Sequence, residues 1–233
     1  MKIYYQWNPW SYMHQASLGI YEKLVWVKID PDFDIIWLSS FNEVWEKIKD
    51  WNIWVLAIEN SYMWSIHTNL YNFLKYDAKI IWEYDLDINH CICSKEKHTK
   101  DIKKVYSQLP ALEQCKNYIK NNNFEWVEYS DTALSAKYVK ENNDSWLWAI
   151  CSEQAAKIYD LNILEKNIQD QNWNTTRFLI IVNKDLDLSY KNKSNKVSLL
   201  FETKDIPASL YKCLWAFATN DINLTKIESM PSY

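Results

Sequence analysis

The sequence predicts an α/β fold whose first part forms a mostly parallel sheet, and three observations support this. Short apolar segments alternate with amphipathic ones through the first 76 residues, in the order strand, helix, strand, helix, strand, helix. Residues 53–58 are an apolar run that ends in a polar Glu-Asn-Ser segment. Residues 177–182 are a second run, rich in β-branched side chains, which two threonines precede.

Each element of this first region has a local signal. Residues 2–6 and 35–38 are typical of short strands. Ser40 and Glu43 have the spacing of a capping box, which opens a helix expected to reach residue 50. The remaining expected elements are helices at 11–24 and from 65 or 67 to 76, and a strand at 53–58 followed by a loop at Glu59, Asn60 and Ser61.

The middle of the chain predicts a second lobe. Residues 79–94 are a long extended stretch whose position suits a crossing between lobes. Asp131 and Ser152 are the expected N-caps of two helices. The predicted elements are helices at 110–119, 132–142 and 152–159, a strand at 147–151, and strands at 163–167 and 177–182 that return the chain to the first lobe.

The C-terminal region has a different character. Residues 185–195 are rich in Lys, Asn and Ser, which is typical of a linker. After it, the pattern predicts a strand at 196–202, a helix at 208–220 and a strand at 223–229. Such a unit leaves a sheet edge and an apolar face uncovered, so we expect a truncated gene product that ends mid-domain.

Composition excludes several classes of function. The net charge of −4 gives no electrostatic case for binding nucleic acid or an anionic membrane. No apolar run approaches the roughly 18 residues that a membrane span needs, and the N-terminus lacks the apolar core of a signal peptide. The 5 cysteines are scattered and share no metal spacing with the 4 histidines. We therefore expect a cytoplasmic protein with reduced thiols and without a cysteine–histidine metal site.

The glycine count is abnormal. The chain has 1 Gly and 14 Trp, although about 16 Gly are expected at the usual frequency near 7%. Tryptophan stands at turn positions that favour glycine, at Trp7, Trp10, Trp51 and Trp173. Our hypothesis is that UGA encodes glycine in this gene and that all the tryptophans except Trp45, on an apolar helix face, stand for glycine. The alternative is a genuinely tryptophan-rich protein, and the codons distinguish the two.

Five segments resemble the prephenate dehydratase family and occur in the family's order. Thr176, Arg177 and Phe178 match its Thr-Arg-Phe signature, and residues 57–61 resemble its Pro-Ile-Glu-Asn-Ser segment. Residues 107–115 resemble its Ser-His-Pro-Gln-Ala-Leu-Ala-Gln-Cys segment, with Gln, Leu and Pro replacing His, Pro and Gln. Residues 8–16 are similar to its N-terminal Gly-Ser-Tyr-Ser-His-x-Ala segment, and residues 167–170 precede the Thr-Arg-Phe as in the family.

The resemblance implies a two-lobed catalytic domain of the periplasmic-binding-protein type (type 2) at residues 1–184. Lobe one would comprise about 1–77 and 160–184, and lobe two about 78–159, with the active site in a cleft that closes by hinge motion. Residues 195–233 would be half of an ACT-type regulatory domain, the β-α-β part of an α+β, ferredoxin-like fold. The implied reaction is the loss of carbon dioxide and water from prephenate to give phenylpyruvate, in L-phenylalanine biosynthesis. Because aromatisation drives the reaction, it needs no cofactor.

The resemblance also implies the catalytic residues. Thr176 would hydrogen-bond the leaving hydroxyl, because a threonine is too weak an acid to donate a full proton alone. Arg177 would hold a carboxylate or fix the loop. Asn60 would line the facing wall, and Glu59 would be a proton partner.

The implied substrate-binding residues come from both lobes. Ser61 and Phe178 lie beside the catalytic residues in the sequence. Ser107 and Gln114 would close over the substrate from lobe two, and Thr132, at a helix N-terminus, is a weaker candidate for a carboxylate.

Regulation and assembly are implied with less support. The family binds L-phenylalanine through a Gly-Ala-Leu turn and a Glu-Ser-Arg-Pro strand, and tends to dimerise. Two substitutions in the turn, a Met in place of the Arg and the missing half-domain all argue against normal feedback. The corresponding residues here are Ala208, Ser209, Leu210, Asn223, Glu228 and Ser229.

Two alternatives stay open. Arogenate dehydratase differs only in taking a substrate with an amine in place of the keto group. A non-catalytic sensor would keep the cleft and bind an aromatic amino acid, although the retained Thr176 and Gln114 favour an enzyme.

Overall fold

A computed structural model of the chain describes residues 1–24, 30–49, 51–97, 104–142, 144, 146–186 and 196–229. The chain divides into two compact units, Met1–Leu186 and Asp187–Tyr233. Most of the expected linker and the expected end of a helix at residue 50 lie outside the described residues. Within the described part of the chain, no helix combines the length and the apolar character that crossing a membrane requires.

The first sheet of unit 1 is parallel among the three N-terminal strands, as the sequence predicts, but its other pairings are antiparallel. Its strand order is β2-β1-β3-β11-β5, with β4 paired to β3. β1 runs parallel to β2 and β3, whereas β11 is antiparallel to both of its neighbours. The strands are β1 (Ile3–Gln6), β2 (Ile35–Leu38), β3 (Ile53–Asn60), β4 (Trp64–Ser65), β5 (Ala78–Asp87) and β11 (Thr175–Asn183).

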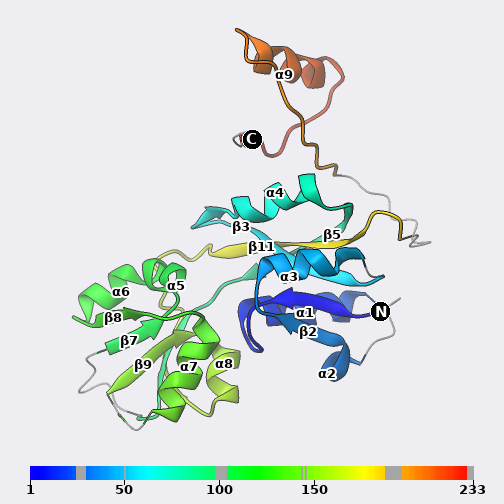
Figure 1. The fold of residues 1–233 in the computed structure, drawn as a ribbon. Helices are drawn as coiled ribbons and strands as arrows, with labels where there is room; N and C mark the ends of the chain where they lie inside the picture. The colour runs from blue at the N-terminus through cyan, green and yellow to red at the C-terminus, as the bar shows by residue number, and fades with distance from the viewer. Residues whose placement is uncertain are drawn as a thin grey trace. The chain divides into compact units, whose positions relative to one another are not determined.

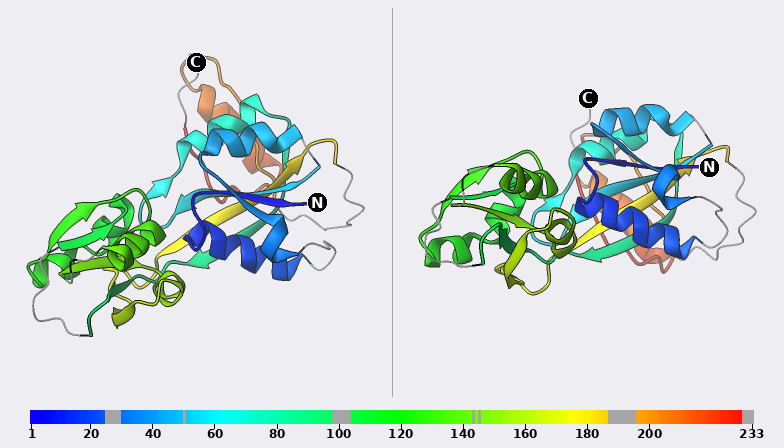
Figure 2. Two further views of the ribbon diagram at one scale, coloured as in Figure 1. Left: turned by 60° about the horizontal axis from the view of Figure 1, so that its bottom comes forward. Right: turned by 90° about the horizontal axis from the view of Figure 1, so that it is seen from below.

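Helices lie on both faces of this sheet (Figures 1 and 2), as an α/β fold requires. α1 (Tyr12–Lys23) lies on one face, and α3 (Phe41–Glu46) and α4 (His67–Lys75) on the other. Trp45 of α3 is fully buried against the α4 face, where Leu70 and Phe73 pack around it. α3 opens as expected, because Ser40 Oγ accepts a hydrogen bond from Glu43 N. The 3₁₀ turn Lys47–Lys49 and a short helix, α2 (Pro31–Asp34), complete this lobe.

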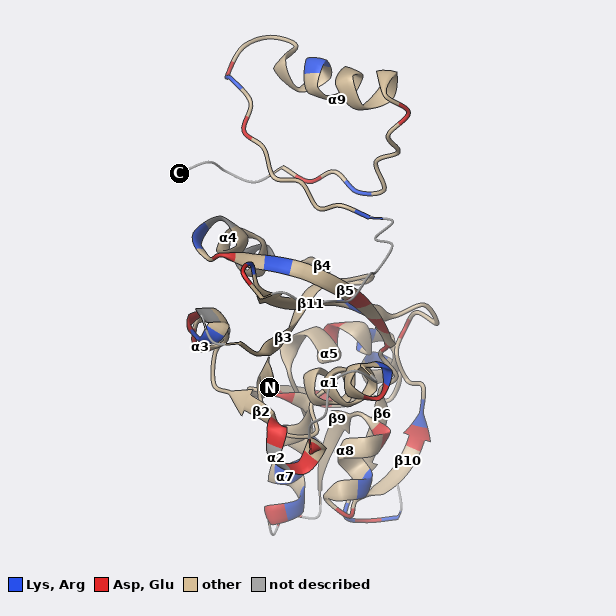
Figure 3. Cartoon of the chain, turned by 90° about the vertical axis from the view of Figure 1, so that its right-hand side faces the viewer, with Lys and Arg blue, Asp and Glu red and all other residues tan. Residues whose placement is uncertain are grey.

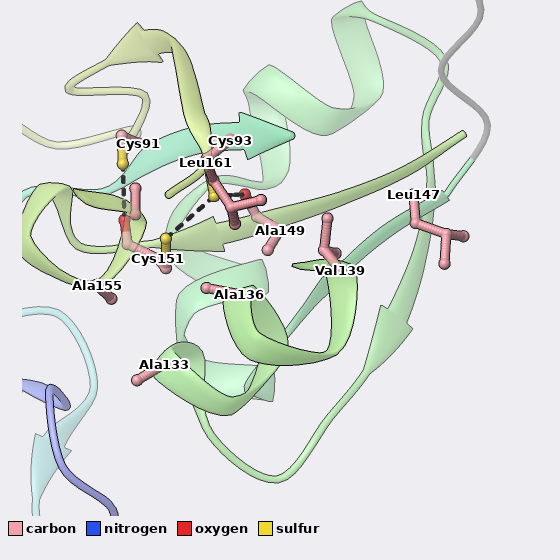
Figure 4. Close-up of a cluster of buried hydrophobic side chains, with 11 residues drawn as sticks. Cys91, Cys93, Ala133, Ala136, Val139, Leu147, Ala149, Cys151, Ala155 and Leu161 are labelled. Atoms are coloured by element: carbon pink, nitrogen blue, oxygen red, sulfur yellow. Dashed lines mark hydrogen bonds between the residues drawn. The ribbon is translucent and has the colours of Figure 1, made fainter. Parts of the chain in front are cut away.

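The second sheet has the strand order β10-β6-β9-β7-β8. Its strands are β6 (Cys91–Ser94), β7 (Lys104–Ser107), β8 (Glu125–Glu128), β9 (Leu147–Cys151) and β10 (Asn162–Lys166). Its helices are α5 (Leu109–Gln114), α6 (Lys116–Asn121), α7 (Thr132–Glu141) and α8 (Glu153–Ile158). Figure 4 shows the core between this sheet and α7, where Cys91, Cys93 and Cys151 lie as buried free thiols.

The structure corrects the expected lobe boundaries. β5 pairs with β11 in the first sheet, so lobe two begins after Asp87 and not at residue 78. β10 pairs with β6 in the second sheet, so the return to lobe one comes after Lys166 and not at residue 160. The expected helix at 110–119 is two short helices that meet at Cys115. These pairings join segments far apart in the sequence, which local patterns do not reveal.

Unit 2 contains one regular element, α9 (Ser209–Thr219), among its described residues. The expected helix is confirmed. The strands expected at 196–202 and 223–229 are wrong, because the described residues there form no ladder. Apolar side chains such as Leu199 and Trp215 are exposed, consistent with a unit too short to bury them.

Two tryptophans have backbone angles that favour glycine. Trp7 has φ of 80° and Trp10 has φ of 73°, in the left-handed region. Trp51 and Trp173, at the other expected turns, are described and are not in that region. At the single glycine, Gly19, the constraint is different, because an added Cβ would overlap the end of the Tyr84 side chain and that ring would have to shift.

Candidate functional site

The predicted catalytic residues Asn60 and Thr176 lie opposite each other on neighbouring strands. Asn60 ends β3, Thr176 is the second residue of β11, and the two are directly paired. Asn60 Nδ2 donates a hydrogen bond to Thr176 Oγ1 at 2.9 Å and to Asn174 Oδ1 at 2.8 Å. The expectation of a loop at Glu59 and Asn60 is therefore wrong, since both belong to the strand.

The orientation of the Asn60 amide is fixed by the backbone. Its Oδ1 accepts hydrogen bonds from the backbone N–H groups of Tyr62 at 3.0 Å and Met63 at 2.9 Å. Only an oxygen can accept these bonds, so the Nδ2 group faces Thr176. The Thr176 oxygen therefore serves as an acceptor, and among the described residues none accepts its hydrogen. The Thr176 hydroxyl is thus available to donate to a ligand.

Gln114 brings lobe two into contact with this pair. Gln114 Nε2 donates to Asn60 Oδ1 at 3.2 Å, and Gln114 Oε1 accepts from Asn174 Nδ2 at 2.9 Å. Gln114 Oε1 also lies 2.7 Å from Nε2 of His90. Tyr62 makes a further link, because its hydroxyl donates to the Glu113 carbonyl at 3.4 Å. Gln114, expected to approach the substrate from lobe two, therefore lies against Asn60 and Asn174 of lobe one.

Arg177 and Glu59 face away from Thr176. Arg177 Nε lies 2.7 Å from Glu59 Oε1, and its NH1 lies 3.2 Å from Glu83 Oε2. Successive side chains of a strand point to opposite faces, so these three share the face opposite Thr176. The guanidinium of Arg177 is thus engaged by two carboxylates of the chain itself. This arrangement fits the expected role of fixing the strand end better than that of holding a substrate carboxylate.

The hydroxyls of Ser61 and Ser107 are engaged in backbone contacts. Ser61 Oγ donates to the Trp173 carbonyl at 2.7 Å and accepts from Thr175 N at 2.9 Å. It therefore holds the turn before β11 in place. Ser107 is fully buried, and its hydroxyl donates to the Ile150 carbonyl at 2.6 Å.

The last two predicted substrate-binding residues are Thr132, at the start of a helix, and Phe178, in the core. Thr132 is the first residue of α7, whose N-cap Asp131 accepts from the backbone of Ala133 and Leu134. Burial raises the pKa of the Asp131 carboxyl. Phe178 is only 1% exposed. Its ring belongs to the core, and its contact with substrate stays a prediction.

Sequence reasoning missed Asn174, His90 and Tyr12. Asn174 precedes the threonines directly and bonds to both Asn60 and Gln114. His90 lies where the long extended stretch breaks between β5 and β6, and its Nδ1 is 3.0 Å from the Tyr12 hydroxyl. The sequence did offer one signal for His90, because it is a polar residue within the stretch that was predicted to cross between the lobes.

The predicted regulatory residues lie in unit 2. Ala208 caps α9 with φ of 63°, in the left-handed region, and Ser209 and Leu210 begin the helix. The described residues that follow α9 form no helix or strand, and they include Asn223, Glu228 and Ser229. Lys226 and Glu228 form an ion pair at 3.1 Å.

One cavity adjoins this network at Tyr12 and Asn89. Its volume is about 360 Å³, and it is lined by residues that include Asp87, Asn89 and Glu153.

Acidic and basic residues are interspersed along the chain (Figure 3). Among the described residues no group of three or more His, Cys, Asp or Glu side chains could hold a metal ion.

Comparisons with known proteins give a consistent result. Residues 3–186 match the family model described as "Prephenate dehydratase". The chain is 40% identical over 206 residues to "Prephenate dehydratase" of Methanocaldococcus jannaschii, covering 88% of this chain and 75% of that protein. It is 35% identical over 221 residues to "Arogenate dehydratase/prephenate dehydratase 2, chloroplastic" of Arabidopsis thaliana, covering 94% of this chain but only 58% of the relative.

The fold is also found among solved structures. The crystal structure of the prephenate dehydratase from Staphylococcus aureus superposes with a TM-score of 0.75 at 26% identity. The superposition covers 99% of this chain and 84% of that one.

Proposed function

The chain belongs to the prephenate dehydratase family, a class of hydro-lyases, and on that premise we propose that it converts prephenate to phenylpyruvate at the Asn60–Thr176 site. The single observation that carries the proposal is the direction of the bond from Asn60 Nδ2 to Thr176 Oγ1. It leaves the Thr176 hydrogen free to bond to a leaving oxygen.

The reaction places a modest demand on these groups. The bond between the ring carbon and its carboxylate breaks, carbon dioxide leaves, and the electron pair moves into the ring. The opposite carbon–oxygen bond breaks at the same time, and the departing hydroxide takes a proton to become water. Thr176 hydrogen-bonds the departing oxygen, and solvent supplies the net proton, because a threonine remains protonated at neutral pH. Aromatisation of the ring supplies the driving force.

The remaining site residues have supporting roles in this proposal. Asn60 and Gln114 orient the Thr176 hydroxyl, and Gln114 brings lobe two to the site. Ser61 and the pair of Arg177 with Glu59 hold the strand ends that carry the site. Ser107 fixes β7 against β9, and Thr132 at the start of α7 is the proposed contact for a substrate carboxylate.

The test compares Thr176→Ala with Thr176→Ser. Phenylpyruvate is measured by the absorbance of its enolate in base, with prephenate or arogenate as substrate. We expect product with the parent, a loss in kcat of about 100-fold or more in the alanine variant, and substantial recovery in the serine variant. Equal activity of the parent and Thr176→Ala would overturn the assignment of the site.

The substrate preference is decided by the same assay. The relative from Arabidopsis is named for both substrates, so a faster reaction with arogenate would identify the amine-bearing substrate. If a folded parent turns over neither compound yet binds L-phenylalanine in calorimetry, the chain is a sensor and the catalytic proposal fails.

Regulation and assembly also remain proposals. L-Phenylalanine is the proposed effector, and a homodimer is the proposed assembly. The left-handed Ala208 supports a turn like that of the family's glycine. Calorimetry with L-phenylalanine tests the first proposal, and light scattering tests the second.

A further inference from the structure

His90 lies buried between the two lobes, in the segment that joins β5 to β6. His90 as a whole residue is only 2% exposed to solvent. The backbone N–H donates to Gln169 Oε1 at 3.0 Å, and the carbonyl accepts from Ile168 N at 3.1 Å. The returning segment after β10 therefore fixes the position of this residue. The proposed chemistry described above does not use it.

The orientation of Asn60 determines which atoms face His90. Because Asn60 Oδ1 is committed to two backbone N–H groups, the group of Gln114 that approaches it must be the amide nitrogen. The other end of the Gln114 amide, Oε1, then faces His90 at 2.7 Å. An amide oxygen only accepts, so the proton of the neutral imidazole must be on Nε2.

The other side of the ring allows this tautomer. With the proton on Nε2, Nδ1 carries a lone pair, and the Tyr12 hydroxyl lies 3.0 Å away. The single hydrogen of that hydroxyl can be donated to Nδ1 or to the Asn89 carbonyl at 2.8 Å, so the contact with Gln114 is what assigns the tautomer. Burial raises the pKa of Tyr12, so that hydroxyl keeps its proton. Burial also lowers the pKa of His90 to about 4, so the ring is neutral near pH 7.

We infer that His90 is a positioning residue: its Nε2–H holds the Gln114 amide in the orientation that donates to Asn60, and so keeps lobe two against the pair of Asn60 and Thr176. The inference rests on the proposed function. If the ring presented a lone pair to Gln114, the Gln114 amide would turn over. Two oxygens would then face each other at Gln114 and Asn60, and the contact between the lobes would weaken.

The first test compares His90→Leu with His90→Gln. Leucine removes the donor, whereas the amide nitrogen of glutamine can occupy the place of Nε2–H. We expect His90→Leu to lower kcat by about 10- to 100-fold with KM changed less than about threefold, because the catalytic groups are misplaced and not removed. His90→Gln should recover kcat to within about fivefold of the parent. A leucine variant with parental kcat, or a glutamine variant no better than the leucine variant, would overturn the inference.

A second measurement needs neither activity nor a variant. Nitrogen-15 correlation spectra of the parent at pH 7 report which imidazole nitrogen carries the proton. A protonated Nε2 with an unprotonated Nδ1 is the expected result, and the opposite tautomer or a charged ring would overturn the inference. If the parent gives no product, the proposed function fails, and this spectrum still decides the orientation of His90.

Discussion

Asn60 Nδ2 donates a hydrogen bond of 2.9 Å to Thr176 Oγ1 across two antiparallel strands. The bond runs in one direction because the oxygen of the same amide is held by the backbone of Tyr62 and Met63. A strand pairing and a tight turn together decide whether Thr176 offers a hydrogen or a lone pair.

Asn60→Asp tests this direction. A carboxylate has no hydrogen to donate, so the Thr176 hydroxyl turns its hydrogen to the new oxygen and no longer offers it to the substrate. We expect kcat to fall by about 100-fold or more while the far-UV circular dichroism spectrum is unchanged. An aspartate variant within about threefold of the parental kcat would contradict the proposed role of the bond.

Arg177→Gln tests whether the guanidinium acts on stability or on substrate. Removing it takes the guanidinium away from the carboxylates of Glu59 and Glu83, which are 28% and 32% exposed. We expect the free energy of unfolding to fall by about 1–2 kcal/mol, less than for a fully buried pair because solvent screens the charges. Adding Glu83→Gln should restore part of the loss in urea denaturation. Parental stability with a collapsed kcat would instead show that Arg177 contacts the substrate.

The left-handed backbone at Trp7 predicts a difference between glycine and alanine. Trp7→Gly and Trp7→Ala both remove the indole, but only alanine keeps a Cβ at φ of 80°. We expect the glycine variant to be more stable by about 1 kcal/mol in thermal unfolding. At Trp51, which is 67% exposed and not left-handed, glycine should have no such advantage.

That comparison bears on the glycine hypothesis. The φ angles of Trp7 and Trp10 support our proposal that glycine is the native residue at these turns. UGA codons at both positions, with glycine in the peptide masses of the protein from its source, are the expected result. UGG codons would refute it.

His90 predicts an acid-dependent loss of stability. Its pKa is about 4 in the folded chain against an ordinary value of 6.5. The unfolded chain therefore binds more protons between these values, and stability falls as pH is lowered from about 6.5 to about 4. The full contribution is about 3 kcal/mol, and His14, whose pKa burial also lowers, acts in the same direction. Urea denaturation should show a shallower pH dependence in His90→Gln than in the parent. Equal slopes would contradict the buried, neutral state of the ring.

The sequence by itself determined the element order and most of the residues of the site. Apolar periodicity located the strands that became β1, β3 and β9, and the caps Ser40, Asp131 and Ser152 each begin a helix as expected. Ordered motifs indicated the family, and they are the basis on which Asn60, Gln114 and Thr176 are proposed as site residues. These signals are local, so they can be read from neighbouring residues alone.

Only the tertiary structure decided which face each residue presents and what it contacts. The pairing of Arg177 with Glu59 follows from strand register, and the burial of Phe178 follows from packing against the sheet. The placement of β10 in the second sheet and the meeting of His90 with Gln114 join residues distant in the sequence. The direction of a hydrogen bond depends on the partners at both of its ends, and here those partners come from both lobes.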